Sequence, residues 1–232
     1  MAKKVESENL ERLKTLVHEK CSLKQDVYAE TLKGFKVLKS AIKQTVSSIE
    51  GSVCSVDERV VVEYREQGNF ESVVTIGGDT VVFHMHSNVF AFPSDHMIHK
   101  SPFIQRTDKS AYFGVINVYN FLSDSFRYQR LNDLGYLIAR IFISKDGHFF
   151  VEGKGQLSYR FNDISIQQVD TEQFKQVIEA AMIYVMNFDL YSPPYHAVQE
   201  ISLMQVMELN NNMKMRTAKR LGFRFESEQK VK

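Results

Sequence analysis

Four of the seven histidines fall between positions 84 and 99, and an aspartate stands among them. His84 and His86 are two apart in a predicted strand, so both imidazoles lie on one face with Cα atoms about 6.6 Å apart. His96 and His99 are three apart, which suits one face of a helical turn, and Asp95 adjoins them. Imidazole and carboxylate groups bind zinc, iron and manganese. The five residues are therefore a candidate divalent-metal site, and with a metal the protein would be a hydrolase-like enzyme.

The same histidines also fit an ordinary protein surface. The apolar residues of segment 81–91 mostly take odd positions, whereas His84 and His86 take even positions. A solvated polar patch on a sheet explains this pattern without a metal, and His96 and His99 are then loop residues. One histidine could also act as an acid or base without a metal. We prefer the surface interpretation, so no cofactor is expected and no enzyme activity is indicated.

A basic stretch near the C-terminus is the second candidate site. Lysine and arginine side chains neutralise phosphates and can drive nucleic-acid binding. The whole chain, however, has a formal net charge of only +1, without the basic excess that such proteins show. Nucleic acid is therefore an alternative partner and not the expected one. The candidate residues for this interface are Lys214, Arg216, Lys219, Arg220 and Arg224.

The N-terminal segment must form helix, because its apolar residues recur at three- and four-residue spacing from Leu10 to Ile49. Gly34 is a candidate position for a kink, since glycine in a helix costs up to about 1 kcal/mol relative to alanine. A line of apolar residues seven apart leads back from Ile49, but Lys14 interrupts it. We predict one long amphipathic helix or a helical hairpin, which packs on its own domain or on a second copy.

A β-rich region follows, with short turns between its segments. Gly77-Gly78-Asp79 predicts a turn, and Asp146-Gly147 predicts a two-residue hairpin turn. Residues 157–161 continue the alternation, so the sheet has about six or seven mostly antiparallel strands. The alternating segments are 58–65, 70–76, 80–92, 111–119, 136–144 and 149–152.

Two C-terminal helices complete the predicted α+β fold. Asp170 and Gln173 form a capping-box pattern before an apolar stripe that ends near Val185. Ser192 can cap a second helix, with Pro193 in its first turn. We divide the chain into a helical segment (1–50), an antiparallel β domain (51–169), C-terminal helices packing on the sheet (170–215) and a basic, partly disordered tail (216–232).

The central part of the chain carries a resemblance. The stretch Val115-Ile116-Asn117-Val118-Tyr119-Asn120-Phe121-Leu122, together with Leu131-Asn132-Asp133-Leu134-Gly135-Tyr136 and the Asp146-Gly147 hairpin, resembles conserved hypothetical bacterial proteins of unknown function. The resemblance covers about the central half of the chain. It implies a bacterial intracellular source but no activity and no catalytic residue.

Composition bounds the remaining choices. Hydrophobic residues make up 44% of the chain, which is enough for a core without metal or disulfide staples. We expect Cys21 and Cys54 to be reduced thiols, and no apolar run is long enough to span a membrane. A cytoplasmic protein is therefore predicted. The leading hypothesis is a non-enzymatic interaction or scaffold module that self-associates or binds a protein partner through its N-terminal helix.

Overall fold

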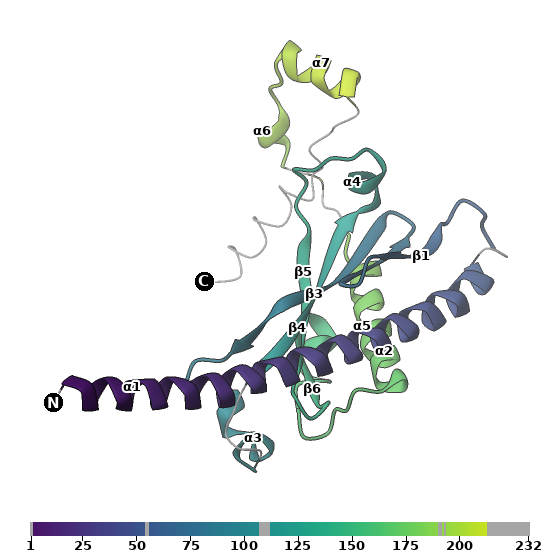
Figure 1. Cartoon of the computed structure of the whole chain (residues 1–232). Coiled ribbons are helices and arrows are strands. Elements are labelled where there is room, and N and C mark those ends of the chain that lie inside the picture. The colour runs from purple at the N-terminus through teal and green to yellow at the C-terminus, as the bar shows by residue number, and fades with distance from the viewer. Residues whose placement is uncertain (1, 54–55, 107–111, 190–191, 193, 213–232) are drawn as a thin grey trace.

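The computed structural model describes residues 2–53, 56–106, 112–189, 192 and 194–212. Figure 1 shows the predicted α+β order: a long N-terminal helix, an antiparallel sheet and then short C-terminal helices. The five basic residues proposed for nucleic-acid binding, the tail from 216 to 232 and Cys54 lie outside the described residues.

The N-terminal helix is a single rod and not a hairpin. Helix α1 (Ala2–Leu16) continues through a π-helical turn, η1 (Val17–Cys21), into α2 (Ser22–Val53). Gly34 does not break α2. A Cβ atom at Gly34 would lie 2.8 Å from Cδ1 of Ile143, so glycine lets the helix approach the sheet closely. Gly34, where the sequence suggested a kink, is therefore a point of close packing between α2 and the sheet.

The π-helical turn explains the interruption of the apolar line at Lys14. A π-helical turn holds one more residue than an α-helical turn. Counting back from Cys21, the next position in the line is therefore Leu13, where the unbroken count gave Lys14. The local hydrogen-bonding register of the helix, which the sequence pattern did not reveal, restores the apolar line.

All six strands belong to one antiparallel meander in which each strand pairs with its neighbours in the chain. The Gly77-Gly78 turn is confirmed, since Ile76 pairs with Asp79 across it. The Asp146-Gly147 turn has three residues and not two, because Ser144 N–H donates to His148 O around Lys145–Gly147. The strands are β1 (Val62–Gln67), β2 (Glu71–Ile76), β3 (Asp79–Ala91), β4 (Tyr112–Leu122), β5 (Tyr136–Ile143) and β6 (Phe149–Gly153).

No seventh strand forms among the described residues after β6. Gly155 has a φ of 55° and begins a short 3-10 helix, η3 (Gly155–Ser158), where the alternation had suggested a strand. Backbone groups of β6 still find partners there, since Val151 N–H donates to Phe161 O. The segment after η3 therefore folds back along the outer edge of the sheet without extending it as a strand.

Two cores lie on opposite faces of the sheet, because alternate residues of a strand point to opposite sides. On the helical face, α2 and α5 (Thr171–Met186) cover side chains such as Phe83, Ile116 and Phe149. On the opposite, aromatic face, a 3-10 turn η2 (Met97–Lys100) and α3 (Pro102–Arg106) cover a smaller core. That core contains Ile98, Ile104, Phe113, Val115, Phe142, Phe150 and Ile164. Helix α2 is thus an integral part of the main core.

The C-terminal helices differ in how they are held. Asp170 caps α5 as predicted, accepting from the backbone N–H groups of Glu172 and Gln173. The capping box is not completed, because Gln173 Oε1 accepts from Gln168 N–H. The predicted second helix is two short pieces, α6 (Tyr195–Val198) and α7 (Leu203–Asn212), while α4 (Ser123–Arg127) lies between β4 and β5.

The phenol of Tyr64 on β1 gives a test of the fold at high pH. Burial raises the pKa of Tyr64 to about 12. The unfolded chain releases this proton near pH 10, so it binds fewer protons than the folded chain between pH 10 and 12. Stability should therefore fall as the pH rises through this window, and Tyr64→Phe should flatten the fall. Urea unfolding at stepped pH values measures it, with the exposed Tyr159→Phe as control; equal slopes for both variants would contradict the assignment.

Candidate functional site

The two strand histidines of the predicted metal site lie on β3 and face the aromatic side of the sheet. Nδ1 of His86 accepts from the backbone N–H of Asn88 at 2.9 Å, and its ring meets the edge of Phe90 with 4.8 Å between centroids. His84 stands opposite Asn117 on β4 and Glu71 on β2. Both rings are half-buried, as a polar patch on a sheet surface requires.

The other two histidines lie at η2. Nδ1 of His96 accepts from the Ile98 N–H and caps the turn, while its ring stacks on Phe92 with 4.2 Å between centroids. Nε2 of His99 lies 3.3 Å from the carbonyl oxygen of Phe92 and therefore carries a proton to donate. Asp95 is exposed. These rings position the chain after β3.

The predicted five-residue metal site is not assembled. Among the residues that the structure describes, no group of three or more histidine, cysteine, aspartate or glutamate side chains lies close enough to hold a metal ion. A β-bulge between Met85 and Val89 and the end of β3 at Ala91 separate the strand pair from the turn pair. The two histidine pairs are therefore close in the sequence but do not meet in space. In each of His86, His96 and His99, one ring nitrogen is also hydrogen-bonded to a backbone group.

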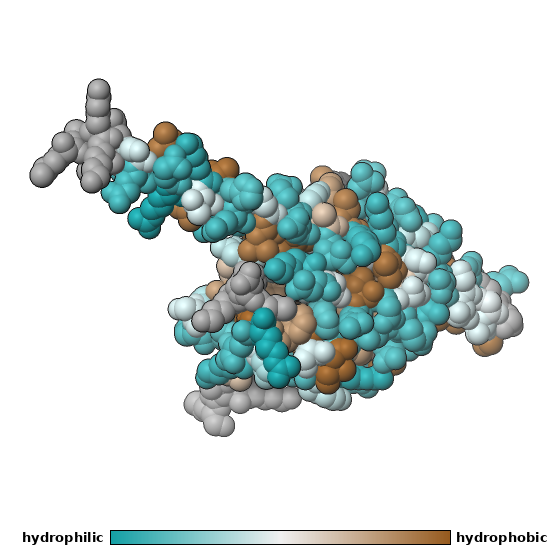
Figure 2. Space-filling view, turned by 60° about the horizontal axis from the view of Figure 1, so that its bottom comes forward, coloured by the Kyte–Doolittle hydropathy of each residue, from teal (hydrophilic) through white to brown (hydrophobic). Residues whose placement is uncertain are grey.

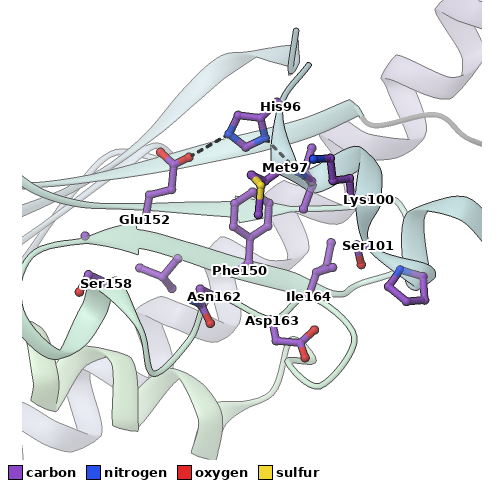
Figure 3. Close-up of a pocket in the computed structure, with 14 residues that line it drawn as sticks. His96, Met97, Lys100, Ser101, Phe150, Glu152, Ser158, Asn162, Asp163 and Ile164 are labelled. Carbon is purple, nitrogen blue, oxygen red and sulfur yellow. Dashed lines mark hydrogen bonds and ion pairs between the residues drawn. The ribbon is translucent and has the colours of Figure 1, made fainter. Parts of the chain in front are cut away.

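His96 instead borders a cavity of about 610 Å³ on the aromatic face. One wall comes from η2 and the start of α3, the floor from β6, and the opposite wall from the segment after η3. Phe150 lies in the middle of the floor in Figure 3, with Met97 above it and Ile164 beside it. The cavity thus joins an apolar floor to a rim of polar side chains.

Both carboxylates of the cavity already have partners. Glu152 pairs with the Arg140 guanidinium, and its Oε1 lies 3.8 Å from Nε2 of His96. Oδ1 of Asp163 accepts from the hydroxyl and the backbone N–H of Ser165. These bonds, the hydroxyl first, hold the pKa of Asp163 below its usual value. Both carboxylates of the cavity are therefore already engaged by neighbouring groups.

The donors of the cavity are still available. The side chains of Lys100, Ser101 and Asn162 form no hydrogen bond or ion pair with any residue that the structure describes. Lys100, Ser101 and Asn162 can therefore donate hydrogen bonds to a ligand in the cavity. The sequence analysis named His96 but not the other residues that line the cavity, because these residues come from three separate segments of the chain.

A different surface lies on the N-terminal helix. Every residue from 7 to 22 is exposed, so this part of the rod stands outside the sheet domain (Figures 1 and 2). Four large apolar side chains on it are each about half exposed: Leu10 at 52%, Leu13 at 56%, Leu16 at 50% and Val17 at 53%. We call these four residues the leucine face. Their spacing of three and four places them on one side of the helix.

The C-terminal helices α6 and α7 also carry exposed apolar side chains. None of their described residues belongs to either core. The exposed set, with Ile201 in the segment between the two helices, is Tyr195, Val198, Ile201, Leu203, Met204 and Met207. Only α5, among the C-terminal helices, thus stabilises the domain through the core.

Comparisons with protein families, curated proteins and solved structures find no match. The resemblance of the central stretch to hypothetical bacterial proteins stays a prediction. Within the described ranges, no helix is both long and apolar enough to cross a membrane. The function must therefore be argued from the surfaces and cavity themselves.

Proposed function

We propose that this protein is an interaction module that self-associates through the leucine face of α1. The observation that supports this function is the free-standing helix, on which four large apolar side chains remain about half exposed. The same rod buries its apolar stripe wherever it meets the sheet, from Val27 to Val46. The leucine face is thus an apolar stripe with no described partner in its own domain.

A free-standing helix of this length benefits from a partner. Isolated helices shorter than about 12–15 residues are marginal in water, and tertiary packing supplies most helical stability in proteins. Covering the exposed part of a leucine or valine contributes on the order of 1 kcal/mol. Association through the leucine face would therefore stabilise α1 as well as join the chains.

The spacing of the leucine face favours a second, antiparallel copy as the partner. Leu10 and Leu16 stand three residues on either side of Leu13 in the sequence. In an antiparallel pair with Leu13 near the two-fold axis, Leu10 of one copy therefore meets Leu16 of the other, and the contact forms an apolar seam. The seam is thus self-complementary in hydropathy.

Sedimentation equilibrium of the full chain tests this proposal. We expect a reversible dimer for the native chain and a monomer for Leu13→Glu, because two carboxylates would be buried at the centre of the seam. Thr15→Glu adds the same charge on the opposite side of α1 and should leave the dimer intact. A monomeric native chain, or equal dissociation by both variants, would overturn the proposal.

Deleting the first 51 residues cannot replace these variants, because that deletion removes Phe35, Leu38 and Ile42 from the core.

A further inference from the structure

We infer that the cavity on the aromatic face binds a small organic carboxylate with a short apolar body. This inference is independent of self-association, because the cavity is lined by η2, α3, β6 and the segment after η3, and not by α1. Its first support is the state of the acidic groups. Glu152 and Asp163 already accept from Arg140 and Ser165, so neither calls for a cationic ligand.

The available groups are donors. Lys100 is the one lysine or arginine that lines the cavity among the described residues, and it has no described ion-pair partner. Figure 3 shows its side chain reaching from η2 over the upper rim, beside Met97. Asn162 lies on the opposite wall and offers an amide N–H donor. An anion between these walls would gain one charge-assisted bond and one neutral bond.

The charge count favours a carboxylate over a phosphate. One free ammonium balances a single negative charge, whereas a phosphate dianion would lie unbalanced near the Asp163 carboxylate. His96 directs neither ring nitrogen toward a ligand, because its Nδ1 accepts the Ile98 N–H and its Nε2 faces Glu152. Oδ1 of Asp163 is engaged by the hydroxyl and the backbone N–H of Ser165, within the same turn.

The floor favours an apolar body on the ligand. Phe150 is 4% exposed and Ile164 2% exposed, so the floor is rigidly packed into the smaller core. Met97, at 72% exposed, covers the opening with a flexible thioether side chain that adapts to irregular shapes. Ligand sites commonly combine such an apolar lining with a few placed polar groups. A ligand with a carboxylate at the polar rim and a short alkyl or aryl group on the apolar floor matches both parts of the cavity.

Hexanoate is a suitable probe, with hexanamide as its neutral counterpart. Titration of the full chain, followed by NMR shifts of the cavity residues, should give saturable hexanoate binding with a Kd on the order of 1 mM, as expected for a ligand of this size. Hexanamide should bind at least about tenfold more weakly, because it lacks the charge that Lys100 recognises. Inorganic phosphate should not displace hexanoate.

Two variants separate the site from general surface attraction. Lys100→Met keeps the length of the side chain and should weaken hexanoate binding about tenfold or more. Lys36→Met removes an exposed charge from α2 and should leave the Kd unchanged. Equal Kd values for the two variants, hexanamide binding as tightly as hexanoate, phosphate displacing hexanoate, or no saturation would each overturn the inference. Leu13→Glu should not alter hexanoate binding, so the two proposals fail separately.

Discussion

Replacing Gly114 by alanine should lower the free energy of unfolding by about 3 kcal/mol, the upper range for overpacking a core. Gly114 lies in β4 directly beneath Thr31 of α2. An added Cβ would lie 2.6 Å from both Cβ and Cγ2 of Thr31, which is far inside van der Waals contact. Thr31 cannot swing away easily, because its hydroxyl donates to Val27 O and its side chain is fully buried.

A second-site change makes this prediction specific. Thr31→Gly removes the three atoms nearest to the new Cβ, so the double variant should recover most of the loss beyond about 1 kcal/mol for glycine in a helix. Thr31→Ala should rescue far less, because its own Cβ stays 2.6 Å from the added atom. Urea unfolding of the native chain, the three single variants and the two double variants measures the coupling. If Gly114→Ala unfolds like the native chain, α2 does not lie this close to β4.

Replacing Asp133 by alanine should destabilise the protein by about 3 kcal/mol, because it removes an ion-pair partner of a buried arginine. The Arg130 side chain is 5% exposed and its Nε lies 3.0 Å from Oδ2 of Asp133. Ser125 also donates its hydroxyl to that carboxylate at 2.7 Å. The network orders the connection between α4 and β5, so its loss should loosen that connection as well as the fold.

A matched exposed pair supplies the control. Asp57 and Arg59 are also linked by a short ion pair, but the Arg59 side chain is 89% exposed. Water screens such pairs, so Asp57→Ala should cost far less stability than Asp133→Ala. Chemical unfolding of both variants compares the two environments directly. Similar small losses for both would mean that the Arg130 site is hydrated in solution.

Several local features followed from the sequence because they depend on near neighbours only. The Gly77-Gly78 turn, the Asp170 cap and the odd-even alternation of β3 each rest on backbone preferences or on side-chain alternation within one element. The errors arose where two local signals competed. Residues 157–161 alternate like a strand, but Gly155 at positive φ turns the chain away first. The Asp-Gly turn took a third residue because Ser144 pairs with His148.

The histidine cluster shows why the spacing of residues in the sequence is not enough to predict a functional site. Spacing placed His84 with His86 and His96 with His99, and each pair does share an element. Whether the two pairs converge depends on the bulge in β3 and the direction of the chain after it, which no short-range pattern contains. The cavity beside His96 was missed for the same reason, since Lys100, Glu152 and Asn162 come together only when η2, β6 and the segment after η3 pack against one another.

The N-terminal helix shows most clearly what the sequence determined and what the tertiary structure determined. The sequence by itself determined an amphipathic helical segment, as one long helix or a hairpin, because apolar residues at three- and four-residue spacing stabilise a helix wherever that face is covered. It could not distinguish Leu13 from Leu38, since both obey the same period. Only the tertiary structure did so: the sheet ends before α1, leaving Leu13 at 56% exposed, while Leu38 is fully buried against it. Burial depends on contacts between distant segments, and those contacts place Leu38 in the core and leave Leu13 exposed.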